Sequence, residues 1–198
     1  MVVVDYSGWE FLLEDPIVFS ALVAILLPFA VIALGFVLNY IGIALAYLVS
    51  LFADPSIVFA AINYLFFPGV MLHELSHALL AFLTGAKITE IALFKREGDA
   101  LGHVSFINRG NFFVQSLQNI FASAAPMFCG ALVVYGCYYG FTHTDILWLK
   151  ILLGYIGVSM FYHMTMSPAD IRIYLRGLPV FIAIVFIVTF VLRVTSVI

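Results

Sequence analysis

The fold is decided by residues 66–83, which read FFPGVMLHELSHALLAFL. This stretch is almost wholly apolar, yet it contains His73, Glu74 and His77 on consecutive turns of a predicted helix. Pro68 and Gly69 precede them and should either kink the helix or begin a new one at Pro68. An ionisable cluster inside an apolar helix is costly to bury, so the stretch predicts a functional site within an apolar helix.

The composition around this stretch excludes an ordinary soluble domain. Hydrophobic residues make up 65% of the 198-residue chain and charged residues only 10%, whereas soluble domains are about 25% charged. Mean hydropathy is +1.17. We therefore expect one membrane-embedded domain covering residues 1–198, with the lipid bilayer as its surroundings. No basic run suggests a nucleic-acid partner, and residues 1–16 lack the basic start of a cleaved signal peptide.

Several apolar runs approach or exceed the roughly 20 residues that a spanning helix needs. They are Ile17–Ala53, Ser56–Leu83, Phe112–Tyr139, Ile146–Met166 and Leu178–Ile198. The first run would be roughly 55 Å long as a straight helix, against a membrane core of about 30 Å. It is either a helical hairpin turning near residues 35–40 or one tilted helix. The pattern predicts an all-α polytopic membrane protein with five or six crossings.

Residues 86–111 differ from the apolar runs. Ile88–Phe94 and His103–Ile107 are rich in β-branched and aromatic residues, and the glycines between them suit a turn. This pattern predicts a small β-hairpin directly after the motif helix.

The basic residues indicate an orientation, because Lys and Arg prefer the cytoplasmic side of a membrane. Half of the eight lie in the hairpin region, and two more follow the fourth apolar run: Lys87, Lys95, Arg96, Arg109, Arg172 and Arg176. We expect this side to be cytoplasmic. The acidic N-terminus then favours six crossings over five, since it would lie outside if the first run crosses twice.

His73-Glu74-Leu75-Ser76-His77 fits the pattern H-E-x-x-H. Residues at positions i and i+4 share one face of a helix, so both imidazoles can bind one Zn²⁺. Glu74 adjoins that face and can act as general base towards a zinc-activated water.

A catalytic zinc usually has three protein ligands. Asp170 is the first choice for the third, with a helix cap or a pair with Arg172 or Arg176 as its structural alternative. His163 is the second choice, as a ligand or an oxyanion donor, with an interhelical hydrogen bond as its alternative. If the helix continued past Pro168, His163, Ser167 and Asp170 would share a face.

The remaining polar residues of the apolar segments have weaker assignments. Asn119 could bind a substrate or stabilise an oxyanion, or it could join helices. His103 could be a ligand only if the hairpin folds back over the site, and a surface position is expected instead. His143 should lie on the opposite side of the membrane. Cys129 and Cys137 match no redox or metal motif and are expected to be buried hydrophobes.

The stretch from His73 to Lys87 resembles the site-2 protease family of intramembrane zinc metalloproteases. In that family the motif helix is also followed by glycine and then β-structure. Ala124-Ala125-Pro126 resembles the family's small-Gly-Pro element, and Asp170 resembles its third ligand. The resemblance covers roughly residues 68–177.

This chain departs from the family pattern at two places. Ala125 stands where glycine is usual, and Ser167-Pro168-Ala169-Asp170-Ile171 lacks the family's Asn before the proline and Gly after the aspartate. No appended soluble domain is visible. We read the chain as a divergent, compact member.

The resemblance implies zinc-dependent hydrolysis of peptide bonds in membrane-embedded substrates, with His73, His77 and Asp170 as ligands and Glu74 as catalytic base. Two other functions stay open. One is a zinc-binding pseudoprotease that captures transmembrane partners without cleaving them, and the other is a structural or transport subunit. The sequence leaves the substrate and the oligomeric state undefined.

Overall fold

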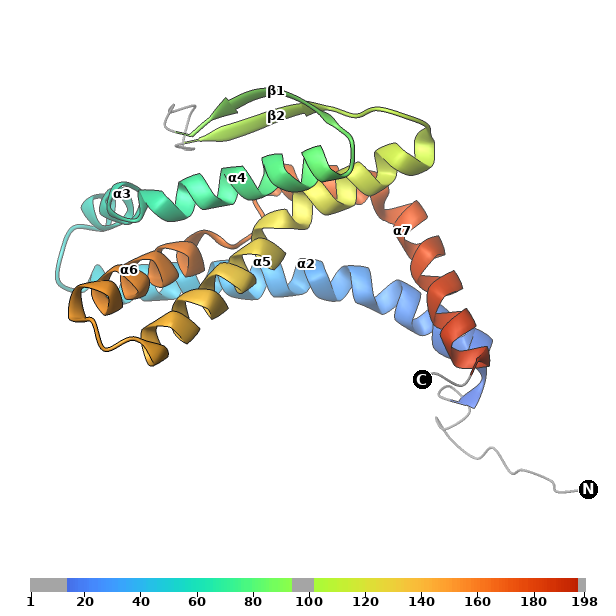
Figure 1. The fold of residues 1–198 in the computed structure, drawn as a ribbon, viewed down its shortest axis with the longest axis horizontal. Coiled ribbons are helices and arrows are strands. Elements are labelled where there is room, and N and C mark those ends of the chain that lie inside the picture. Colours follow the sequence, from blue (N-terminus) through green and yellow to red (C-terminus); the bar gives the residue numbers. More distant parts are fainter. Residues whose placement is uncertain (1–13, 94–101, 196–198) are drawn as a thin grey trace, which may run out of the picture.

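The computed structural model describes residues 14–93 and 102–195, and these are mostly helical (Figure 1). Its elements are α2 (Pro16–Val49), α3 (Pro55–Leu65), α4 (Phe67–Leu83), β1 (Lys87–Ala92), β2 (His103–Ile107), α5 (Phe112–His143), α6 (Leu147–His163) and α7 (Pro168–Val194). The expectation of a helical fold with a small two-stranded sheet after the motif helix is confirmed. The acidic residues at the N-terminus and the turn of the hairpin lie largely outside the described residues.

Three of these helices, α2, α5 and α7, are long and apolar enough to cross a membrane. A fourth span results if α3 and α4, which meet at an angle of 59°, are counted as one. The expected five or six crossings are therefore not confirmed.

Helix α2 is one continuous helix, and the hairpin alternative near residues 35–40 is not adopted. Asp15 caps its start by accepting hydrogen bonds from the backbone amides of Ile17 and Val18. After the end of α2, Asp54 caps the start of α3 by accepting a hydrogen bond from the amide of Ser56. Hydrogen bonds from Ser56 lower the pKa of the Asp54 carboxyl. Six crossings required the first apolar run to cross the membrane twice, and a single continuous helix does not do so.

The expected break at Pro68-Gly69 is present, because α4 begins at Phe67 with Pro68 in its first turn. Ser159 of α6 stabilises the break. Its hydroxyl donates to the carbonyl oxygen of Phe66 (2.7 Å) and accepts from the amide of Gly69 (2.7 Å). A Cβ atom at Gly69 would collide with the carbonyl oxygen of Ser159, so only glycine permits this close approach of α6.

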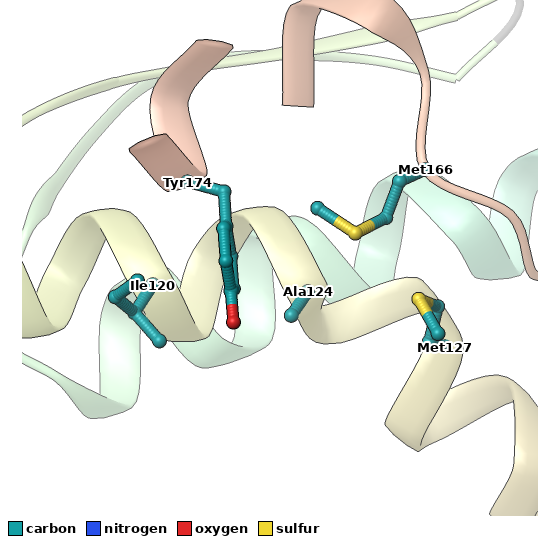
Figure 2. Close-up of a cluster of buried hydrophobic side chains, with 5 residues drawn as sticks. All are labelled: Ile120, Ala124, Met127, Met166 and Tyr174. Atoms are coloured by element: carbon teal, nitrogen blue, oxygen red, sulfur yellow. The ribbon is translucent and has the colours of Figure 1, made fainter. Parts of the chain in front are cut away.

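Helix α5 lies at the centre of the fold, packed against α4, α6 and α7, while α2 packs mainly against α7. The main hydrophobic cluster joins α5 to α7 and the segment before it. Figure 2 shows its buried members, which are Ile120, Ala124, Met127, Met166 and Tyr174. This packing fixes the start of α7 against the middle of α5.

The two strands pair antiparallel, from Lys87 opposite Ile107 to Ala92 opposite His103, with an irregularity between Ile88 and Glu90. The sheet lies along α4 (Figure 1). Its base is held by Gln118 of α5, whose fully buried amide bonds to the carbonyl oxygens of Thr84 and Arg109 and to the amide of Arg109.

Helix α7 begins earlier than the apolar run 178–198 predicts. Ser167 and Asp170 form a reciprocal capping box that starts the helix at Pro168. Because α6 ends at His163, the expected helical face shared by His163, Ser167 and Asp170 does not exist.

Helices α6 and α7 run in the same direction along α2. Tyr162 lies next to Gly42, Met166 lies next to Gly35, and Arg193 stacks on the ring of Phe19. As the residue numbers rise from α6 to α7, the residue numbers of their neighbours on α2 fall, so both helices run antiparallel to α2. The two helices form one interrupted path, broken at residues 164–167.

Candidate metal centre

Three predicted ligands meet in the described structure. His73 and His77 come from adjacent turns of α4, and Asp170 comes from the first turn of α7. Nε2 of His77 lies 3.0 Å from Nε2 of His73 and 3.3 Å from Oδ1 of Asp170. The distance from Nε2 of His73 to Oδ2 of Asp170 is 4.0 Å. Within residues 14–93 and 102–195, no other three His, Cys, Asp or Glu side chains converge in this way.

Backbone carbonyls set the orientation of both imidazole rings. Nδ1 of His73 lies 2.6 Å from the carbonyl oxygen of His163, and Nδ1 of His77 lies 2.7 Å from that of Ala122. A carbonyl oxygen can only accept a hydrogen bond, so each Nδ1 must carry the proton. In the neutral ring Nε2 is then an unprotonated acceptor, which is the form in which histidine binds a metal.

The consequence is that three electron-donating atoms point at one small volume. Two Nε2 lone pairs and a carboxylate repel one another at these distances unless a positive charge lies between them. The positive charge can be a proton or a metal cation. These three side chains could therefore hold a metal ion.

The spacing of the three atoms suits zinc. Tetrahedral zinc with bonds of about 2.0–2.2 Å places its ligand atoms roughly 3.3 Å apart. The two Nε2 atoms are 3.0 Å apart and Nε2 of His77 is 3.3 Å from Oδ1 of Asp170, both near that value, while Nε2 of His73 is 4.0 Å from the other carboxylate oxygen, Oδ2. Two neutral imidazoles and one carboxylate are also a ligand set found in catalytic zinc sites.

Asp170 serves two purposes at once. Its Oδ2 accepts a hydrogen bond from the amide of Ser167 (2.8 Å), while its Oδ1 faces His77. The helix-cap role expected as the structural alternative is therefore present together with the ligand position. The cap holds the buried carboxylate at a fixed place beside the histidines.

The three residues line a cavity of about 380 Å³ together with Glu74. Its wall includes Gly102, His103, Val104 and Phe106 from the hairpin. Gly102 lies close to Glu74, since a Cβ atom added there would be 3.0 Å from Cγ of Glu74. The hairpin thus folds back over the site, and His103 lines the cavity. The expectation of a surface position away from the site is wrong for this residue.

His163 is not among the converging ligands. Its backbone carbonyl holds His73, and its own Nδ1 bonds to the carbonyl oxygen of Ser159 (2.8 Å). The ring lines the cavity, but its neutral form has no proton on Nε2 with which to stabilise an oxyanion.

Asn119 does not line the cavity in the described structure. Its side-chain oxygen accepts a hydrogen bond from the amide of Asn108 (2.7 Å), so it helps to connect the hairpin to α5. The expected alternative, a bond between helices, is not the one adopted, because Asn108 lies in the loop between β2 and α5.

Several polar residues of the cavity wall were not singled out in the sequence. They include Asn63 of α3 and Tyr162 of α6. A signal for Asn63 exists, because positions 63, 70, 73 and 77 form one stripe when read with a helical period. His143 lies at the far end of α5, where its Nδ1 bonds to the carbonyl oxygen of Tyr139.

No protein-family model matches the chain, and no curated protein or solved structure gives a significant match. Inference about function therefore depends on the geometry of the site.

Proposed function

We propose that this chain is an intramembrane zinc metalloprotease of the site-2 protease type, with His73, His77 and Asp170 as metal ligands. The observation that carries the proposal is the convergence of three electron-donating atoms whose directions are fixed by backbone hydrogen bonds. Bound zinc would supply a Lewis acid that polarises a carbonyl group and activates a water molecule at neutral pH.

Glu74 is the proposed general base. It directly follows His73 on α4 and lines the same cavity. A carboxylate at this place can accept a proton from the attacking water and pass it to the leaving amine. The carbonyl oxygens of His163 and Ala122 hold the Nδ1 protons of His73 and His77, which leaves each Nε2 directed at the proposed metal position.

The proposed substrate is an unwound segment of a membrane-embedded protein. Helical carbonyls already accept hydrogen bonds, so a helix must open before one of them can be attacked. Strand β2 borders the cavity through His103, Val104 and Phe106 and can pair with an extended chain by strand addition. The cavity beside the metal site then holds the scissile bond.

For the membrane topology we propose four crossings, made by α2, by α3 with α4, by α5, and by α6 with α7. Five crossings would require α6 and α7 to cross in opposite directions, whereas their neighbours along α2 indicate one direction. The basic residues near the hairpin favour a cytoplasmic position for that side, with the active site opening towards it.

A pseudoprotease remains the second candidate, because Ser167-Pro168-Ala169-Asp170-Ile171 departs from the family pattern. It would use the same zinc and the same cavity but would not cleave. A structural or transport subunit would have a proton in place of zinc between His73, His77 and Asp170.

The test is Glu74→Gln in purified protein, assayed with a membrane-protein substrate in detergent micelles. Removing the base should lower the cleavage rate by at least about 100-fold while zinc content stays unchanged. Glu14→Gln, at an exposed position before α2 and outside the cavity, is the matched control and should retain zinc and most of the activity. Cleavage that persists in Glu74→Gln would overturn the proposed mechanism, and a wild-type protein that binds zinc without cleaving would favour the pseudoprotease.

A further inference from the structure

Asn63 is a polar residue in the otherwise apolar second half of α3, in the sequence Phe59-Ala60-Ala61-Ile62-Asn63-Tyr64-Leu65. It is half-buried and lines the same cavity as the metal ligands. Within the described part of the chain, no hydrogen bond reaches its side-chain amide. A polar side chain that faces a cavity inside a membrane helix indicates a substrate path rather than helix packing.

The cavity that Asn63 lines also has apolar and aromatic residues from the neighbouring helices. Val70 of α4 and Tyr162 of α6 line the same cavity, and the ring of Tyr162 stacks on Phe66 with centroids 5.5 Å apart. This stacking fixes one wall beside the break between α3 and α4. The amide of Asn63 is therefore a hydrogen-bonding group of the cavity wall without a partner among the described residues.

An unwound substrate needs such a group. Its backbone N–H and C=O groups lose their helical partners, and lipid offers no replacement. One asparagine amide has two donor hydrogens and an acceptor oxygen, so it can pair with both backbone groups of one residue. Asn119, the amide first considered for substrate binding, is turned towards Asn108 instead.

The separation between Asn63 and His73 indicates which substrate residue would contact Asn63. Asn63 precedes His73 by ten positions, which is about 15 Å of helix at most. An extended peptide rises about 3.3 Å per residue. A chain lying along the cavity would therefore pass Asn63 roughly four residues from the bond beside the metal.

We infer that Asn63, with Val70 and Tyr162, forms a subsite that binds the main chain of an unwound transmembrane segment at a distance from the scissile bond. This inference rests on the proposed function for its substrate class. Asn63 would be a specificity residue and not a catalytic one, since it lies apart from His73, Glu74 and His77.

The test measures binding to Glu74→Gln protein in micelles, so that no cleavage interferes. The probe is a synthetic Leu/Ala transmembrane peptide, labelled with fluorescein, with a central Asn-Gly pair that opens its helix. Asn63→Leu in this background should weaken binding at least tenfold while zinc content stays at the level of the parent. The control is Asn39→Leu, which makes the same change at an exposed position of α2 outside the cavity, and it should leave binding unchanged.

A second measurement uses the protein with Glu74 intact. Asn63→Leu should raise KM for the peptide at least fivefold and leave kcat within twofold, because the contact lies away from the reacting bond. Unchanged binding by Asn63→Leu, an equal loss in Asn39→Leu, or no binding of the probe to the parent would each overturn the subsite. Binding that depends on Asn63 without any cleavage by the wild type would keep the subsite and overturn the protease.

Discussion

Gly69 illustrates how the candidate metal site depends on a single close contact. At this position α6 approaches α4 so closely that a side chain would collide with the carbonyl oxygen of Ser159. The same turn of α6 ends in His163, whose carbonyl oxygen orients His73. Packing at Gly69 and the direction of a metal ligand are therefore linked.

Gly69→Ala should destabilise the protein by about 1–3 kcal/mol, because the added methyl group must push α6 away. The shift of the His163 carbonyl should also weaken zinc binding about tenfold. Thermal unfolding in detergent and a competitive zinc titration measure the two effects. Gly136→Ala is the matched control, since a Cβ atom there has no neighbour within 4 Å. Equal behaviour of the two variants would show that α6 does not hold His73.

At the scale of single residues, the sequence was sufficient to predict that the candidate site residues of one local motif lie together. His73, Glu74 and His77 are four residues apart or less, so helix geometry alone places them together. Asp170 came from the family resemblance and from its position after an apolar run. The carbonyls of His163 and Ala122 could not be predicted, because every residue has a carbonyl and only packing decides which ones meet a histidine.

Among the elements, the hairpin depends on a buried amide for its position. Gln118 connects the end of α4 to the loop that leads into α5, through three hydrogen bonds to backbone groups. Among the described residues, no other side chain donates a hydrogen bond to the carbonyl oxygens of Thr84 and Arg109. The part of the cavity wall that the hairpin forms is thus held in place by a residue of α5.

Gln118→Leu should lower the free energy of unfolding by about 2–4 kcal/mol, since it leaves buried backbone groups unpaired. The hairpin should also become open to limited proteolysis after residue 84. Gln115→Leu provides the comparison, because its amide bonds only to the exposed carbonyl oxygen of Gly110. A hairpin that stays protected in Gln118→Leu would contradict the role assigned to this amide.

Helix boundaries show the limit of hydropathy. The apolar run 178–198 gave no sign that α7 begins at Pro168, because its first turns contain Asp170, Arg172 and Arg176. The capping box of Ser167 and Asp170 explains the early start. By contrast, both strands of the hairpin were placed within two residues, because β-branched residues and flanking glycines mark their ends.

For the whole molecule, the direction of α6 and α7 along α2 is the observation behind the proposed four crossings. Hydropathy counts apolar runs, but it cannot show that two successive runs continue in one direction after a break. That information lies in contacts between distant parts of the chain, such as Phe19 with Arg193.

Reporter fusions test the four-crossing topology. A green fluorescent protein fused after Ile198 should fluoresce in a bacterial host, and alkaline phosphatase at the same place should be inactive. Both results place the C-terminus in the cytoplasm, on the hairpin side. Five crossings predict the opposite pair of results, and a reporter fused after Asp145 provides the extracytoplasmic control.

The metal content of purified protein tests the central claim most directly. Wild-type protein should contain one zinc per chain, and Asp170→Asn should bind zinc at least about tenfold more weakly, because an amide is a poorer zinc ligand than a carboxylate. Asparagine retains an oxygen that can accept from the amide of Ser167, so the cap and the fold should remain. Asp54→Asn, at the start of α3 and outside the cavity, should keep its zinc. Wild-type protein without zinc, or Asp170→Asn with undiminished affinity, would contradict the proposed metal centre.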